Sequence, residues 1–291
     1  MGDRQTAAPE VGADPGVDFP VALLKVPVAE WAAAIDVRHS ARTYAPTRVD
    51  PAVIAHLIDF CVGLPGKEMA RVVVVPQAPA SLFTGLVGGY GKVLDAPSAL
   101  MMIGNESSPT VLEGVGYLGE ATILEATTVD LGTCWVGGSY DRAVAGRLTP
   151  LALDERVYAV SPLGHATPRA RAGDRLLKRM VGAHKRKPIE VAAPGFDSLV
   201  WPDWAAEGVR LAMIAPSAVN RQPWRFEFDA TAPDSLVISV VEKGPEGRVA
   251  RRLDCGIAML HFEVGARLLG AKGAWEILRH PRVARFRLLG V

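Results

Sequence analysis

The sequence predicts an α+β fold made of two related halves. The first observation is that segments with apolar residues at helical spacing are interspersed with short apolar or alternating segments that are typical of strands. The second is a weak internal repeat. A shift along the chain that carries position 131 onto position 269 superimposes Leu131-Gly132 on Leu269-Gly270, with Trp135 and Trp275 slightly out of step. We therefore interpret the chain as a duplication in which each half has a long helix followed by a strand with a tryptophan.

The composition indicates a globular protein that binds a small molecule. A chain of 291 residues with 49% hydrophobic and 22% charged residues is long enough to bury one large core or two modest ones. Lys and Arg total 32 against 31 for Asp and Glu, so the net charge is +1. A balanced charge creates no general attraction for nucleic acid or for an anionic membrane. We expect neither as a partner.

The cysteines, the lack of long apolar stretches and the composition of the N-terminal residues indicate the cellular compartment and the division of the chain. Cys61, Cys134 and Cys255 are far apart and odd in number, which argues against a disulfide framework and a zinc cluster and favours the reducing cytoplasm. No stretch approaches the roughly 20 apolar residues that cross a bilayer. Residues 1–20 are acidic and rich in Pro and Gly, and we interpret them as a disordered leader. The predicted halves are residues 21–188 and 189–291.

Three helices and three strands are predicted in the first half. Val28, Trp31 and Ile35 lie on one face of the first helix. The other helices are expected over 51–62 and 113–131, and the strands over 72–75, 98–103 and 157–161. Gly132 stands where the third helix requires a left-handed cap.

The second half is predicted to begin with a helix of which Trp201, Leu211 and Ala212 form the apolar face. Pro223 lacks an amide hydrogen and fits the first position of a strand, in which Trp224 and Phe226 alternate with polar residues. The remaining predicted elements are a strand over 236–241, a helix over 254–270 and further short strands.

The polar loop Pro216–Trp224 connects the first helix and strand of the second half. It contains Ser217, Asn220 and Gln222 between two prolines. An Asn amide has two donor hydrogens and one acceptor, which suits the edge of a flat heterocycle. The alternative is a turn whose Asn and Ser side chains satisfy only their own backbone. The loop taken alone leaves both interpretations open.

Two basic segments are further candidates for binding a ligand. Arg38-His39-Ser40-Ala41-Arg42 follows the first helix and is either a solvated turn or a phosphate clamp, because guanidinium groups bind phosphate through paired hydrogen bonds. Residues 168–187 contain many Lys and Arg and only one acid, Asp174. They lack the interleaved aromatic residues of a nucleic-acid surface, so a solvated linker is favoured. The end of this tract alternatively adds positive charge to a phosphate site.

Three motifs together resemble the FMN-dependent nitroreductase family. They are Arg-His-Ser-x-Arg at 38–42, Leu-Gly-Thr-Cys-Trp-x-Gly-Gly at 131–138 and Pro-Ser-x-x-Asn-x-Gln-Pro-Trp at 216–224. The resemblance extends over about residues 28–275. It implies a nitroreductase-like α+β fold with mainly antiparallel sheet flanked by helices. Members of that family are usually homodimers that bind the flavin at the subunit interface.

The resemblance also implies a set of cofactor-binding residues. Arg38, Ser40 and Arg42 would contact the FMN phosphate and ribityl chain, the Asn220 amide would contact the flavin, and Gln222 would hold the loop. Residues 135–137 would approach the ring, partly through backbone atoms. The full set is Arg38, His39, Ser40, Arg42, Trp135, Val136, Gly137, Lys185, Lys187, Pro216, Ser217, Asn220 and Gln222.

The order of the motifs differs from that of the family, in which the Pro-Ser-x-x-Asn loop follows the arginine motif within a few dozen residues. Here the corresponding region, residues 61–66, lacks the Asn and the Gln. Because each motif occurs once, we expect a monomer that acts as its own dimer, with one FMN between the halves and a second site that has been lost.

The function implied by the resemblance is an FMN-dependent oxidoreductase. It would take hydride from NAD(P)H and reduce a nitroaromatic, a quinone or a similar small-molecule electron acceptor. The flavin carries this chemistry, so no catalytic side chain and no metal are expected. The alternative is a flavin-binding or flavin-storage protein with little or no turnover.

Overall fold

The computed structural model describes residues 16–20, 27–83, 92–167, 185–241 and 244–290. The helices of the first half are α1 (Val28–Val37), α2 (Pro51–Gly63), α3 (Val111–Thr128) and α4 (Arg142–Leu148), with a 3-10 turn at Ala80–Phe83. Its strands are β2 (Ala70–Val75), β3 (Ser98–Asn105), β4 (Gly132–Thr133) and β5 (Glu155–Gly164).

In the second half the helices are α6 (Ile189–Ala192), α7 (Asp203–Ala212) and α8 (Arg251–Leu268), with a 3-10 turn at Ala218–Asn220. Its strands are β6 (Trp224–Phe228), β7 (Ser235–Val240), β8 (Gly273–Ile277) and β9 (Arg282–Leu288), and β1 (Val17–Asp18) joins them from the start of the chain. The long predicted helices and strands are therefore confirmed, whereas α4 and α6 are short helices that periodicity did not reveal.

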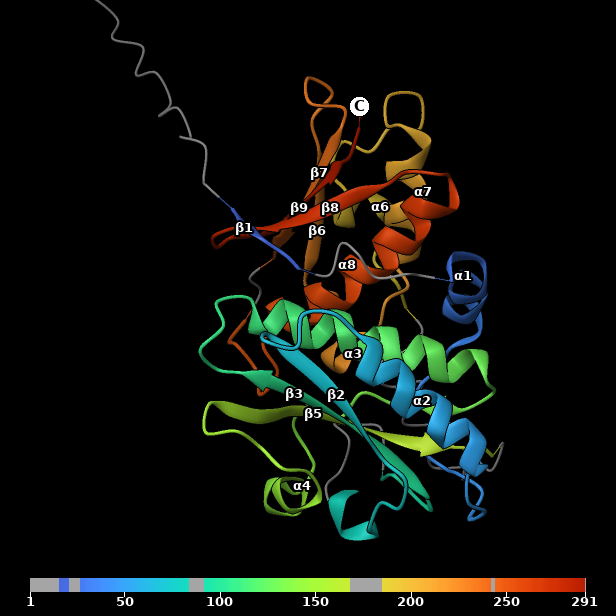
Figure 1. The fold of residues 1–291 in the computed structure, drawn as a ribbon. Helices are drawn as coiled ribbons and strands as arrows, with labels where there is room; N and C mark the ends of the chain where they lie inside the picture. The colour runs from blue at the N-terminus through green and yellow to red at the C-terminus, as the bar shows by residue number, and fades with distance from the viewer. Residues whose placement is uncertain (1–15, 21–26, 84–91, 168–184, 242–243, 291) are drawn as a thin grey trace, which may run out of the picture.

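Two antiparallel sheets lie on opposite sides of the central helices α3 and α8 (Figure 1), which confirms the α+β class. The strand order is β2-β3-β5-β4 in one sheet and β1-β8-β9-β7-β6 in the other. Apart from β1, each sheet therefore places its first, second, fourth and third strands side by side. Each long helix connects the second strand of its sheet to the third. This shared topology supports the predicted duplication.

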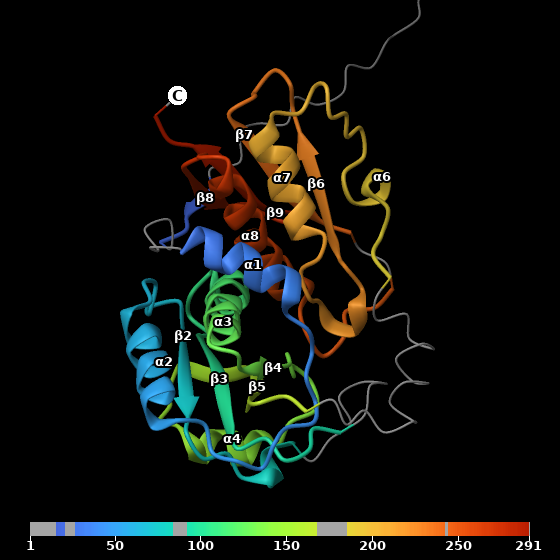
Figure 2. The same cartoon turned by 90° about the vertical axis from the view of Figure 1, so that its right-hand side faces the viewer.

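Helices α3 and α8 cross where two glycines meet. A side-chain carbon on Gly116 would overlap the Leu253 carbonyl oxygen, and one on Gly256 would overlap the Glu113 carbonyl oxygen. The two contacts are symmetric, because one shift along the chain carries Glu113 onto Leu253 and Gly116 onto Gly256. Helix α1 packs against both central helices (Figure 2).

The same shift relates the ends of the two helices and corrects the predicted repeat. It carries Asp130 onto Gly270, and both have left-handed backbones, with φ of 59° and 79°. The predicted cap Gly132 instead belongs to β4, where a Cβ would lie 2.8 Å from the Ala166 side chain. The predicted alignment was wrong because it paired Gly132 with Gly270. In the corrected alignment Trp135 corresponds to Trp275.

Strand β6 shows why the second half folds as its sequence predicted. Trp224 and Phe226 are buried and alternate with the exposed Arg225 and Glu227, so the apolar face packs inward. Strand β3 is buried along nearly its whole length. Its outer face is covered by a second apolar cluster that includes Leu82, Phe83 and residues of α4.

The predicted disordered leader is wrong for its last residues. Val17 pairs with Ile277 and Asp18 with Glu276, and the Gly16 N–H donates to the Glu276 carboxylate at 3.0 Å. The pairing of β1 with β8 extends the sheet of the second half by one strand. Residues 1–15 of the leader, and residues 168–184 of the basic tract, lie outside the described residues. Within the described ranges, no helix is long and apolar enough to cross a membrane.

Candidate functional site

A cavity of about 520 Å³ lies where the two halves meet. It brings together the segment after α1, the segment after β4, the loop before β6 and the start of α8. Every predicted cofactor-binding residue lines it except Lys185, Lys187 and Gln222. Residues that are distant in the sequence therefore share one site, and a cavity of this size is typical of small-molecule ligands.

The loop between α7 and β6 has an unusual backbone. Val219, Asn220 and Gln222 have φ of 48°, 54° and 46°, in the left-handed region that a β-branched residue rarely adopts. A backbone in this region is strained, and it persists only where the surrounding structure holds it in place. Strained backbones of this kind are frequent at ligand sites. The Ser217 hydroxyl accepts a hydrogen bond from the Gln222 N–H at 2.9 Å. Ser217 and the exposed Val219 both line the cavity.

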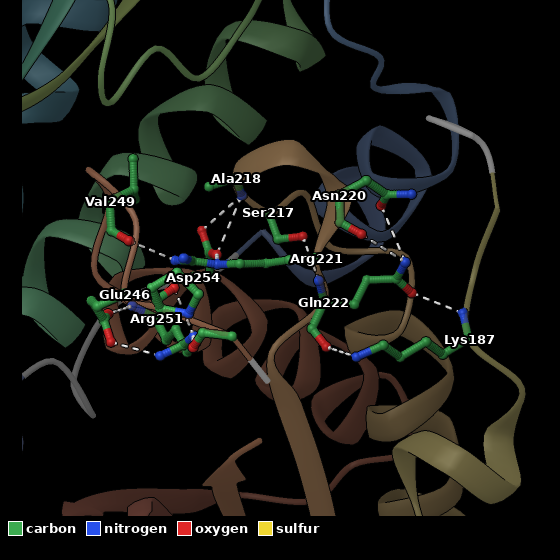
Figure 3. A network of polar contacts seen from close by, with 12 residues as sticks. Lys187, Ser217, Ala218, Asn220, Arg221, Gln222, Glu246, Val249, Arg251 and Asp254 are labelled. Carbon is green, nitrogen blue, oxygen red and sulfur yellow. Dashed lines mark hydrogen bonds and ion pairs between the residues drawn. The ribbon is translucent and has the colours of Figure 1, made fainter. Parts of the chain in front are cut away.

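Gln222 holds this loop against the segment before α6 (Figure 3). Its side-chain oxygen accepts from the Lys187 N–H at 2.9 Å, and its side-chain nitrogen donates to the Lys185 carbonyl at 3.0 Å. These contacts match the predicted role of Gln222 in holding the loop in place. Lys187 adds a hydrogen bond from its side-chain nitrogen to the Gln222 carbonyl.

The Asn220 amide is turned into the loop. Its oxygen accepts from Arg186 Nη1 at 3.1 Å and from Gln222 Nε2 at 3.2 Å, and its nitrogen donates to the Lys185 carbonyl at 2.9 Å. The expected contact between this amide and a flavin edge therefore has to compete with bonds that the loop itself makes. The loop thus satisfies its own polar groups, as the alternative interpretation expected, and at the same time lines the cavity.

Arg186, rather than Lys185 or Lys187, faces the cavity. Its guanidinium donates to the carbonyls of Ile214 and Ala215 at 2.8 and 3.1 Å as well as to Asn220. Burial, and secondarily the Arg38 guanidinium, lower the pKa of Arg186 from its ordinary value. Of the three basic residues at the end of this tract, Arg186 therefore lines the cavity, whereas the predicted Lys185 and Lys187 do not.

The arginine motif also lines the cavity. Arg38 directly follows α1, and its side chain is only 7% exposed, with Nε 3.6 Å from the Glu120 carboxylate. Arg42 Nη1 donates to the Ser40 carbonyl at 3.3 Å. Ser40 forms a parallel bridge with Thr133, which fixes the motif beside β4. His39 lines the cavity rim with an exposed ring.

The segment after β4 contributes differently from the prediction. The backbone N–H and carbonyl of Val136 both pair with Val160 at 2.9 Å, so they are engaged within the fold. A Cβ on Gly137 would lie 2.5 Å from the Val249 side chain, so close packing with Val249 already accounts for this glycine. Trp135 lines the cavity while its indole N–H donates to Glu120 at 2.6 Å.

Sequence reasoning missed a pair of charges at the start of α8. The Asp254 carboxylate is buried and accepts from Arg221 Nε at 2.7 Å and from the Ala218 N–H at 3.1 Å, while Arg221 also donates to the Val249 carbonyl (Figure 3). Burial raises the pKa of Asp254 to about 6, although Arg221 opposes the rise. The sequence contained one signal of this pair, because Asp254 is a charged residue on the buried face of a helix and such residues are rarely buried without a partner.

The cavity suits a ligand that carries a phosphate group. Arg38, Arg42 and Arg186 face it, and Asp254 is the one carboxylate among its described lining residues. Arg38 Nε is buried without a hydrogen-bond partner in the described structure. A phosphate would supply a negative charge and an acceptor oxygen for Arg38 Nε. Within the described ranges, no cluster of His, Cys, Asp or Glu has the arrangement of a metal site.

Comparisons with known proteins agree with this geometry. A family model described as "Putative TM nitroreductase" matches residues 30–266. The crystal structure described as that of "a putative nitroreductase" from Thermotoga maritima has 22% sequence identity and a TM-score of 0.59, covering 89% of this chain and 93% of that chain. At this identity the likeness concerns the fold, which is nitroreductase-like.

Shorter solved structures match about half of the chain. A nitroreductase with bound FMN from Bacteroides fragilis is 16% identical over 50% of this chain and 92% of its own, with a TM-score of 0.40. An FMN-dependent nitroreductase from Clostridium difficile is 16% identical over 48% of this chain and 89% of its own, with a TM-score of 0.39. No curated protein matches the sequence.

Proposed function

Because the chain belongs to the family described as "Putative TM nitroreductase", we propose that it is an FMN-dependent oxidoreductase. It takes hydride from NAD(P)H and reduces a small-molecule acceptor such as a nitroaromatic or a quinone. One observation carries the proposal: the arginine segment of the first half and the 216–221 loop of the second half line the same cavity.

The residues of the cavity have distinct tasks in this proposal. Arg38, Arg42 and Arg186 bind the FMN phosphate, because their charges exceed the negative charge of the described cavity wall. The hydroxyls of Ser40 and Ser217 offer hydrogen bonds to the ribityl chain. Trp135 and Ile257 provide apolar surface for the ring system.

Bound FMN would supply the hydride chemistry, accepting two electrons from the nicotinamide and passing them to the acceptor. The chain contributes binding, orientation and electrostatic field. Its guanidinium groups favour negative charge on any bound ligand. The position of the loop is set by Gln222 and Arg186, so the binding surface exists before the ligand arrives and the ordering cost of binding is small.

Flavin reduction tests the proposed activity directly. The protein is reconstituted with FMN and mixed anaerobically with NADH and, separately, with NADPH, while the absorbance of oxidised flavin is followed. We expect bleaching with at least one donor and recovery when a quinone is added. An Arg156→Gln variant, whose guanidinium pairs with Glu106 away from the cavity lining, should bleach at the same rate as the natural protein.

Two other results would change the assignment. Flavin that binds but stays oxidised with both donors would contradict the oxidoreductase and favour the flavin-storage alternative. Absence of FMN binding would contradict both functions. Loss of binding in Arg38→Ala and in Asn220→Ala, with the circular dichroism retained, would support a site shared between the halves.

A further inference from the structure

We propose that Glu120, a buried carboxylate outside the cavity lining, is the positioning residue that holds Arg38 and Trp135 on two walls of the flavin site. The inference rests on the proposed function, because it assigns a role toward bound FMN. Glu120 lies near the middle of α3 and has no exposed surface. Burying a carboxylate costs a large desolvation free energy, which only close opposite charges and hydrogen bonds can offset.

Two partners of Glu120, Trp135 and Arg38, line the cavity, although they come from different segments. The indole N–H of Trp135 donates to Oε2 at 2.6 Å, and Arg38 Nε lies 3.6 Å from Oε1. Without this carboxylate, the half-buried indole N–H and the buried Arg38 Nε would lack an anionic partner among the described residues. Glu120 itself is absent from the lining, so it acts on a ligand through these two side chains.

His261 of α8 completes the arrangement from the other half. Its Nε2 lies 2.9 Å from Glu120 Oε1, and its Nδ1 lies 3.2 Å from the Leu211 carbonyl oxygen. A carbonyl oxygen only accepts, so Nδ1 is the donor to Leu211, and Nε2 is left to face the Glu120 carboxylate. This contact anchors Glu120 to the second half.

The charges around Glu120 explain why Arg38 stays in a buried position. Arg38, Arg42 and Arg186 all line the cavity, and the Arg38 guanidinium repels that of Arg186, as its lowering of the Arg186 pKa indicates. The Glu120 carboxylate is the nearest opposite charge to Arg38 among the ion pairs of the described residues. Glu120 therefore offsets the repulsion on Arg38 before a phosphate binds. The Arg38 guanidinium is in this way already held in its position for binding.

The second half contains a comparable buried carboxylate whose partners lie outside the lining of the described cavity. Glu263 of α8 is equally buried and accepts from the Trp275 indole N–H at 2.9 Å and the Tyr117 hydroxyl at 2.6 Å. It also pairs with Arg267. None of these partners lines the described cavity. Glu263→Gln therefore removes the same kind of buried charge from the same kind of tryptophan contact without touching the flavin site.

The affinity for FMN, measured by quenching of flavin fluorescence, tests the inference. We expect Glu120→Gln to weaken FMN binding roughly tenfold or more, because a misplaced guanidinium loses charge-assisted bonds to the phosphate. Glu263→Gln should stay within about twofold of the natural protein. Circular dichroism and urea unfolding of each variant establish that the chain is folded.

A double-mutant cycle with Arg38→Gln separates positioning from general damage to the fold. If Glu120 acts through Arg38, Glu120→Gln in the Arg38→Gln background should weaken FMN binding by less than about threefold. Fully additive effects would overturn the inference, as would wild-type affinity in Glu120→Gln.

A conservative variant keeps the test decisive if Glu120→Gln does not fold. Glu120→Asp retains a carboxylate on α3 but withdraws it from Arg38 and Trp135. We expect an intermediate affinity and the same non-additivity with Arg38→Gln, and unchanged affinity would contradict the role. A natural protein that binds no FMN would overturn the proposed function itself, whereas normal binding in the natural protein and in Glu120→Gln overturns the inference alone.

Discussion

At the scale of single residues, the cavity depends on which neighbours along the chain face inward. Residues 185–187 all carry positive charge, yet only Arg186 lines the site. Pro188 favours an extended conformation for the residue before it, and successive side chains of an extended segment point to opposite sides. The composition of the tract predicts charge near a phosphate, but it does not identify the residue that provides the charge.

Arg186→Gln is expected to weaken FMN binding roughly tenfold to a hundredfold, as for the loss of one or two hydrogen bonds to a charged group. The variant also frees the 214–220 loop from its guanidinium anchor. Lys185→Gln is the matched control, because the described contacts of Lys185 use its backbone carbonyl. Fluorescence titration compares the two, and equal losses would contradict the assignment to Arg186.

Asp254 is expected to make stability depend on pH. Its folded pKa of about 6 exceeds the ordinary value of 3.8 because of burial, so the folded chain binds the proton more tightly than the unfolded chain. This contribution to stability is therefore greatest below the ordinary value, declines as pH rises and is lost above about 6.

Urea unfolding of the natural protein and of Asp254→Asn measures this contribution. Between about pH 4.5 and 7, the unfolding free energy of the natural protein should fall by about 2 kcal/mol relative to the variant. A constant difference over this range would show that Asp254 titrates normally in the folded protein.

At the scale of elements, the close crossing of α3 and α8 sets the relation between the halves. Gly116 and Gly256 allow each helix to approach the backbone of the other. This contact positions Glu120 and His261 on facing helices, where they bond to each other behind the cavity wall. A larger residue at either glycine would separate the helices and open the site.

Gly256→Ala should destabilise the fold by roughly 3 kcal/mol, because its methyl group would overlap the Glu113 carbonyl oxygen. Gly146→Ala is the control within a helix, since a Cβ there has no neighbour within 4 Å. It should be neutral or stabilising by up to about 1 kcal/mol. Thermal unfolding by circular dichroism distinguishes the two, and similar midpoints would contradict the tight crossing.

At the scale of the whole molecule, the two sheets repeat one topology but the functional motifs do not repeat. The loop between α7 and β6 contains Ser217, Asn220 and Gln222, whereas residues 64–69, between α2 and β2, contain none of these residue types. The arginine motif likewise occurs only after α1. A single chain with both motifs can therefore build one complete site from two unlike halves.

We expect titration to give one FMN per chain and light scattering to give a monomer of about the sequence mass of 31.0 kDa. The cavity uses both motifs, and each is present once. Two FMN per chain would contradict the lost second site. A stable dimer with one FMN per two chains would contradict the monomer that acts as its own dimer.

The sequence by itself determined the long helices, most strands and the three motifs, because periodic burial, prolines and residue chemistry are local properties. Tertiary structure decided the register of the repeat, the choice of Arg186, the inward turn of the Asn220 amide and the pairing of Asp254 with Arg221. These depend on contacts between residues distant in the chain, where backbone overlap and buried charge have their largest energetic effects.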